Sequence, residues 1–157
     1  MQKITPFLWF DGNAEEAVNF YASIFENSKI IGVSRHSDES ANASGRPKGS
    51  AMVVKFQVYG QEFMALNGGP RFKFNEAISF VVNCETQAEV DFFWEKLSEG
   101  GQKSRCGWLK DKYGVSWQIV PTALARLMET ATHGRSKRIM HALMRMDKLD
   151  KQTLEQA

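Results

Sequence analysis

Two cysteines are the first side chains in this sequence to test for chemistry, because a thiolate can act as a nucleophile or hold a metal. Cys84 and Cys106 form no CxxC pair and have no histidine at zinc-site spacing. A thiol without a nearby base is more often a small buried hydrophobe, so Cys106 beside Asp111 is only a minor nucleophile candidate. We expect reduced thiols rather than a disulfide or a zinc knuckle.

Three histidines are the next candidates, since an imidazole can be a base or a metal ligand near neutral pH. His36 borders a polar stretch, and His133 and His141 lie near the C-terminal end of the sequence. The pattern places none of them in a predicted strand. We therefore interpret all three as solvated or loosely packed side chains.

Charge and hydropathy exclude several classes of protein. The 157 residues carry 20 Lys and Arg against 18 Asp and Glu, for a formal charge of +2, so nucleic acid is not the expected partner. No stretch approaches the roughly 20 apolar residues of a membrane span, and the N-terminal residues have no signal-peptide core. We expect a cytoplasmic protein with one hydrophobic core, residues 1–157, because the chain is too short for two ordinary domains.

The elements that must position any site appear first in residues 3–67. Residues 3–10 and 29–35 are rich in β-formers, and between them a helix is predicted from an Asn13 cap with Glu16 three residues later. Residues 36–50 are polar and small and are predicted to be a mobile loop. Two further strands, 51–59 and 61–67, meet in a hairpin at Tyr59-Gly60. The predicted order is βαβββ.

The same order begins again in the second half of the chain. Residues 77–82 are β-rich, Thr86 and Glu89 form a potential capping box, and a helical apolar stripe follows. Val18-Asn19-Phe20-Tyr21 aligns with Val90-Asp91-Phe92-Phe93, and Tyr59-Gly60 with Tyr113-Gly114. Agreement of a helix and a turn in the same order predicts an internal repeat. The predicted fold class is α+β, with two βαβββ modules, residues 1–70 and 71–121, forming a cupped mixed sheet.

A C-terminal helical tail is predicted for residues 122–157. Helical spacing covers residues 123–128 and 135–146, and Asp150 caps a last short helix near Leu154. The second of these helices has a broad, methionine-rich apolar face that must be covered. It packs on its own domain, across a homodimer, or on a different protein, which is the interaction-module alternative.

Several segments resemble the PhnB-like, or 3-demethylubiquinone-9 3-methyltransferase-like, family of the vicinal-oxygen-chelate superfamily. They are residues 4–13 (ITPFLWFDGN), Asn83-Cys84-Glu85, and residues 106–121 (CGWLKDKYGVSWQIVP). The resemblance covers about residues 3–121. It implies a glyoxalase-like fold, a concave interior for a ligand and a homodimer whose cups both chains complete.

Metal-using members of that superfamily hold a divalent ion with His and Glu from the first and last strands of each module. The corresponding positions here are Ile4 and Glu76, or Thr5 and Ala77 one residue later. In the last strands they are Met64 and Gln118. Isoleucine and methionine do not hold a hard ion. We therefore predict no metal and no cofactor, and no motif supports a methyltransferase, because the Gly-rich turn between strand and helix is missing.

Strand alternation from Gln118 gives the predicted lining of the cup. It is mostly apolar, with one carboxyl and one amide, and suits a small apolar or aromatic organic molecule. We predict metal-independent binding of such a molecule; the alternatives are an enzyme acting through Glu76 or Gln118 on a small organic substrate, and a dimeric interaction module. A closed core without a cavity is the competing interpretation. The predicted ligand-binding residues are Pro6, Leu8, Phe10, Met64, Glu76, Ile78, Phe80, Trp108, Asp111, Ser116 and Gln118, with Trp108 and Asp111 at the rim or anchoring a turn.

Overall fold

A computed structural model of the chain describes residues 2–157 in two compact units, the first ending at Lys73 and the second beginning at Phe74. Within residues 2–157, no helix is long and apolar enough to cross a membrane.

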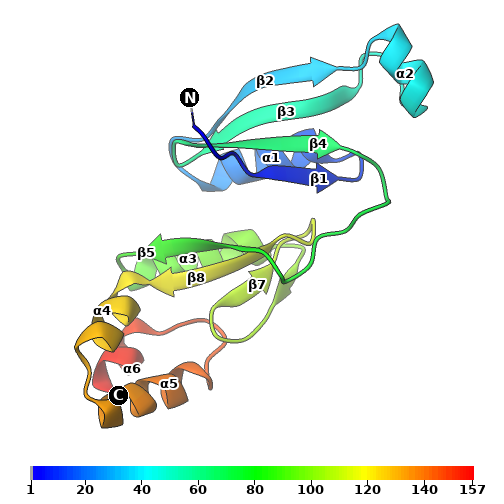
Figure 1. Cartoon of the computed structure of the whole chain (residues 1–157). Helices are drawn as coiled ribbons and strands as arrows, with labels where there is room; N and C mark the ends of the chain where they lie inside the picture. Colours follow the sequence, from blue (N-terminus) through cyan, green and yellow to red (C-terminus); the bar gives the residue numbers. More distant parts are fainter. Residues whose placement is uncertain (1) are drawn as a thin grey trace. The chain divides into compact units, whose positions relative to one another are not determined.

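The first unit is a four-stranded mixed sheet with helix α1 on one face (Figure 1). The strand order is β1-β4-β3-β2, with β1 parallel to β4 and the other neighbours antiparallel. The elements are β1 (Phe7–Phe10), α1 (Ala14–Ile24), β2 (Lys29–Arg35), α2 (Asp38–Ser44), β3 (Ala51–Val58) and β4 (Gln61–Asn67).

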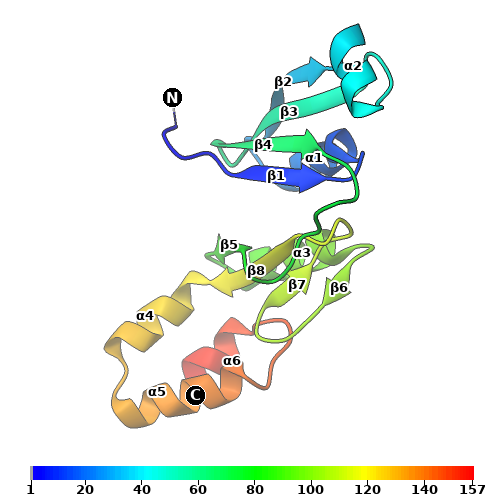
Figure 2. The same cartoon turned by 45° about the vertical axis from the view of Figure 1, so that its right-hand side comes forward.

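The second unit repeats this arrangement and adds the tail helices (Figure 2). Its sheet has the order β5-β8-β7-β6, again with the first strand parallel to the last. The predicted α+β fold with repeated βαβββ units and a helical tail is confirmed. The elements are β5 (Ser79–Cys84), α3 (Gln87–Ser98), β6 (Gln102–Lys103), β7 (Trp108–Lys110), β8 (Ser116–Pro121), α4 (Thr122–Thr130), α5 (His133–Leu143) and α6 (Lys151–Gln156).

Local sequence explains several element boundaries. Tyr59 and Gly60 both have left-handed backbone conformations, with φ of 52° and 76°, as a two-residue hairpin between β3 and β4 requires. The Thr86 hydroxyl accepts the backbone N–H of Glu89 and caps α3. Asp150 caps α6 by accepting the N–H of Thr153 at 2.7 Å.

Two local predictions, the Asn13 cap and the loop 36–50, are wrong. The Asn13 side chain does not cap α1; the carboxamide oxygen of Asn67, at the end of β4, accepts the N–H of Ala14 instead. The predicted loop 36–50 contains α2, whose first turn is closed by reciprocal hydrogen bonds between Ser37 and Ser40. A short polar helix has no apolar stripe, so hydropathy did not show it.

Burial defines the helix-facing side of the second sheet. Trp117 and Ile119 of β8 and Leu109 of β7 are buried under α3, together with Val90 and Leu97 of that helix. Ser116 and Gln118 therefore point to the opposite, open face, as do Trp108 and Lys110 of β7, which pair with Gln118 and Ser116 respectively. This open face is the surface on which a site can be built.

Candidate functional site

A cavity of about 510 Å³ lies over the open face of the second sheet, at its β6–β7 edge. Its size is within the range of sites for small organic molecules. The sheet supplies Gln102, Trp108, Leu109, Lys110 and Ser116; the β6–β7 loop supplies Ser104, Arg105 and Cys106; and Glu76 comes from the segment before β5.

An ion pair forms one side of this cavity. The ammonium group of Lys110 contacts the carboxylate of Glu76. The hydrogen bond from Lys110 lowers the pKa of Glu76 below its ordinary value, and the carboxylate is therefore ionised at neutral pH. Arg105 adds a second cation to the lining, so the charged groups comprise two cations and one anion.

Ser116 is the most unusual member of the lining. Its side chain is buried, at 1% exposure, and its hydroxyl has no hydrogen-bond partner among the described residues. Leaving a buried hydroxyl unpaired costs about 1–3 kcal/mol. The alternation of β8 turns the Ser116 side chain away from the helix-packed Trp117 and onto the face that the cavity covers.

The β6–β7 loop forms the cavity wall, and we define this wall loop as residues 104–107. Ser104 N–H donates to the carbonyl of Trp108 at 2.9 Å, and Trp108 N–H donates back to the carbonyl of Arg105 at 3.0 Å. Cys106 and Gly107 then take consecutive left-handed conformations, with φ of 58° and 83°. This tight turn places Cys106 in the lining of the cavity.

The structure brings three of the predicted ligand-binding residues together, since Glu76, Trp108 and Ser116 all line the cavity. Gln118 shares the open face with Ser116 but is not among the lining residues; its amide Nε2 donates to the Ser79 hydroxyl at 2.9 Å. Ile78 precedes β5 and is 73% exposed.

The predicted strand parity is wrong for Leu8, Phe10 and Phe80. In the first sheet, Leu8 pairs with the buried Ala65, and Phe10 is 2% exposed beneath α1, whereas Met64 pairs with the 53% exposed Phe7. Phe80 packs against Trp117, with ring centroids 5.4 Å apart, on the α3 side. Pro6 precedes β1, and its carbonyl accepts the N–H of Met64.

Asp111 lies inside the turn between β7 and β8 rather than at the rim. Its Oδ1 accepts the N–H groups of Tyr113 and Val115. With 3% exposure, this carboxylate is a structural anchor, one of the two roles expected for it.

Six further residues of the lining were not among the predicted ligand-binding residues: Gln102, Ser104, Arg105, Cys106, Leu109 and Lys110. Alternation along Trp108-Leu109-Lys110 already places Lys110 on the face of Trp108 and would have found it. Ser104, Arg105 and Cys106 belong to the wall loop, for whose conformation the sequence gives no local signal, and Gln102 lies in the two-residue strand β6.

The residues of this chain do not fit the divalent ion of metal-using glyoxalase-like proteins. Across residues 2–157, no three His, Cys, Asp or Glu side chains gather closely enough to hold a metal. At the positions in question, Met64 is a thioether, the Gln118 amide donates to Ser79, and Glu76 is paired with Lys110. Hard divalent ions require several oxygen or imidazole ligands.

Comparisons with known proteins agree with the fold. The family model described as 3-demethylubiquinone-9 3-methyltransferase matches residues 2–120. The PhnB protein from Bacillus cereus is 39% identical, with a TM-score of 0.69, and all of that chain covers 77% of this one. Protein PA1353 from Pseudomonas aeruginosa is 23% identical with a TM-score of 0.63; 98% of it covers 77% of this chain.

A third similar structure is the fosfomycin resistance protein FosX from Listeria monocytogenes, complexed with Mn(II) and sulfate. It is 14% identical and has a TM-score of 0.55, and the whole of that protein covers 83% of this chain. At this level of identity the similarity supports the fold and nothing more. None of the curated proteins matches the sequence.

Proposed function

This chain belongs to the 3-demethylubiquinone-9 3-methyltransferase family, a PhnB-like branch of the vicinal-oxygen-chelate fold, and we propose that it binds a small apolar or aromatic organic molecule without a metal ion. The proposed site is the cavity over the second sheet. The observation that carries the proposal is the buried, unpartnered hydroxyl of Ser116 in its lining.

Ser116 gives the bound molecule a polar contact. A ligand oxygen or nitrogen that pairs with this hydroxyl removes the cost of leaving it unsatisfied, about 1–3 kcal/mol. Because the interaction takes place away from bulk water, it favours a molecule with one well-placed polar group over one without it. Pocket specificity commonly depends on a few such groups among apolar surfaces.

Trp108 and the stem of Lys110 supply the apolar surface for the body of the ligand. Both belong to β7 and lie on the same face of the sheet, because one residue, Leu109, separates them in the strand. An indole ring offers a flat area for stacking, and a lysine stem packs along it while its ammonium stays at the edge. This combination suits a flat organic molecule.

The family's description names a methyltransferase, but we do not propose that activity for this chain. Each sheet here has four strands with a single parallel pair. The nucleotide-binding crevice of doubly wound proteins needs adjacent parallel strands, each followed by a helix, and a glycine-rich first turn. The mixed sheets and the polar donors of the cavity support binding rather than that chemistry.

Native mass spectrometry of untagged protein isolated from cells tests the proposal, because one spectrum reports assembly state, metal content and any retained molecule. We expect a reproducible organic adduct without stoichiometric metal. Ser116→Ala should lower affinity for that adduct, or for the probes benzoate and indole, by about tenfold. Ser98→Ala, at another buried serine of the second unit, is the control. A stoichiometric divalent metal, or equal affinities in both variants, would contradict the proposal.

A further inference from the structure

The wall loop 104–107 holds a backbone conformation that needs outside support. Cys106 carries a side chain and still adopts a φ of 58°, directly before Gly107 at 83°. A left-handed conformation costs a non-glycine residue about 1–2 kcal/mol, and it persists only where the surroundings enforce it. The elements around the loop should therefore show what enforces it.

Support from the β8 side is a single backbone contact. The carbonyl of Gly107 accepts the N–H of Ile119 at 2.8 Å. The two backbones lie so close together that a Cβ atom on Gly107 would be 2.8 Å from the carbonyl oxygen of Ile119.

Support from the opposite side comes from the C-terminal tail. Cys106 N–H donates to the carbonyl of Met146 at 2.8 Å, and Gly107 N–H donates to the carbonyl of Asp147, also at 2.8 Å. The buried side chain of Leu149 packs over the same glycine, 3.1 Å from where its Cβ would be. Both left-handed residues are thus bonded to the tail through their own amides.

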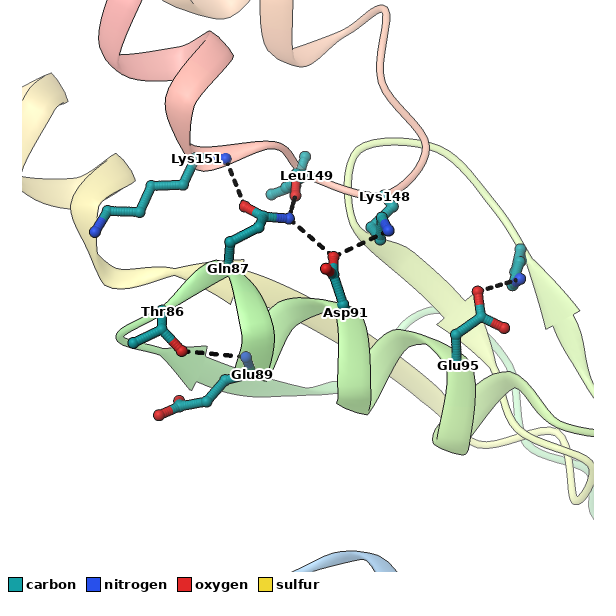
Figure 3. Close-up of polar contacts among 9 residues, drawn as sticks. Thr86, Gln87, Glu89, Asp91, Glu95, Lys148, Leu149 and Lys151 are labelled. Carbon is teal, nitrogen blue, oxygen red and sulfur yellow. Dashed lines mark hydrogen bonds and ion pairs between the residues drawn. The ribbon is translucent and has the colours of Figure 1, made fainter.

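A polar clamp from α3 holds that part of the tail in place (Figure 3). The Gln87 amide donates to the carbonyl of Leu149 at 3.0 Å and accepts the N–H of Lys151 at 2.8 Å. The Lys148 ammonium pairs with the Asp91 carboxylate at 2.9 Å, and Gln87 also donates to Asp91. We define this clamp as Gln87 and Asp91 with residues 148–151.

From these contacts we infer that the C-terminal tail sets the shape of the ligand cavity, with Gln87 and Asp91 as positioning residues that act through residues 146–149 on the wall loop. The tail lies beyond residue 120, where the family match ends. The cavity wall of this chain is therefore supported by a segment outside that match, which makes the tail a determinant of which molecules the cavity admits.

Cys106 provides a built-in probe of this inference, whether or not a ligand is known. This residue lines the cavity and is partly exposed. Cys84 is buried in β5, and burial raises the pKa of its thiol to about 12, so it reacts only when the unit unfolds. Because Cys106 is already partly exposed in the native protein, a faster alkylation of Cys106 without alkylation of Cys84 reports release of the wall loop, whereas alkylation of both reports general unfolding.

The experiment is iodoacetamide labelling of full-length variants, with each thiol followed by peptide mass spectrometry. We expect Gln87→Ala to raise the labelling rate of Cys106 by about tenfold, because hydrogen bonds to two parts of the tail are lost. Cys84 should stay unlabelled. Lys148→Ala, a milder change at the other half of the clamp, should raise the Cys106 rate less.

Glu95→Ala is the matched control, because it removes an α3 ion pair with Lys103 that does not involve the tail. A Cys106 rate within twofold of wild type in Gln87→Ala, or a parallel rise at both cysteines, would overturn the inference. Since labelling needs no bound molecule, failure of the proposed ligand binding would leave this result unaffected.

Discussion

The indole Nε1 of Trp117 donates a 2.9 Å hydrogen bond to Oδ2 of Asp111, and both side chains are buried. The other carboxylate oxygen accepts the N–H groups of Tyr113 and Val115 in the same turn. One carboxylate therefore fixes the β7–β8 turn and the inward-facing aromatic ring of β8. Because β8 alternates, fixing Trp117 on the α3 side also fixes Ser116 on the cavity side.

Replacing Asp111 should destabilise the protein strongly. We expect Asp111→Ala to lower the free energy of unfolding by about 3 kcal/mol, because two buried N–H donors and one partly buried donor lose a charged acceptor. Urea denaturation followed by tryptophan fluorescence measures this change. Asp38→Ala, at an exposed ion pair with Lys48, should change it by less than about 0.5 kcal/mol. A loss below about 1 kcal/mol in Asp111→Ala would show that the turn does not depend on this carboxylate.

A second prediction concerns which face of β1 is buried. Phe10 is buried beneath α1 whereas Phe7, in the same strand, is 53% exposed. Phe10→Ala should therefore lower the free energy of unfolding by about 3–5 kcal/mol, and Phe7→Ala by less than about 1 kcal/mol. Both variants are compared by urea denaturation. The reverse order would restore the face assignment that strand alternation alone suggested.

This strand also shows why sequence alone could not assign its faces. Residues 7–10 are Phe-Leu-Trp-Phe, so both faces are apolar and alternation carries no information about which one meets the helix. The choice is made by pairing with β4, more than 50 residues away in the chain, where Ala65 is the buried partner of Leu8. The repeated order of strands and helices was predictable, because caps, turns and periodicity are local signals.

The candidate site likewise has residues that the sequence predicts and a loop that it does not. Trp108 and Ser116 were predictable because β7 and β8 alternate clearly around the buried Leu109 and Trp117. The wall loop was not, because its conformation depends on hydrogen bonds to residues 146 and 147 at the other end of the second unit. Contacts between segments so far apart leave no mark in local spacing.

Acid should loosen the tail clamp through Asp91. The hydrogen bond from Lys148, with a further one from Gln87, lowers the pKa of Asp91, while the neighbouring Asp150 has its own pKa lowered by the Thr153 N–H. A carboxyl whose pKa is lower in the folded than in the unfolded state stabilises the folded protein at pH values above its unfolded pKa of about 4. This stabilisation is lost as the pH falls through the folded-state pKa. Amide hydrogen-exchange protection at Cys106 and Gly107 should therefore be constant near neutral pH and fall in acid.

Asp91→Asn separates this effect from general acid unfolding. The variant should show lower protection at Cys106 and Gly107 near neutral pH and a weaker fall in acid, because Asp91 no longer titrates. Protection in the first unit, for example at Ala65, should be the same in both proteins. An identical acid profile at Gly107 in wild type and variant would assign the loosening to another group.

Glu76 should compete with anionic ligands for the Lys110 ammonium group rather than act as a base. Its carboxylate is held ionised by Lys110 at the cavity edge, so a bound anion must share or displace that ammonium. Glu76→Gln removes the competing charge. We expect affinity for benzoate to rise by a few-fold while affinity for indole, which has no charge, stays the same. Titrations followed by tryptophan fluorescence or NMR measure both affinities, and added salt should reduce the gain for benzoate.

Glu62→Gln is the matched control for this change, since Glu62 forms a half-buried ion pair with Lys55 in the first unit. It removes one negative charge at a residue outside the cavity lining, so any effect on benzoate that it shares with Glu76→Gln comes from net charge. An equal gain for benzoate and indole in Glu76→Gln would mean that the substitution enlarges the cavity. No gain for either would place the anion away from Lys110, leaving Arg105 as the cation of the lining to test next.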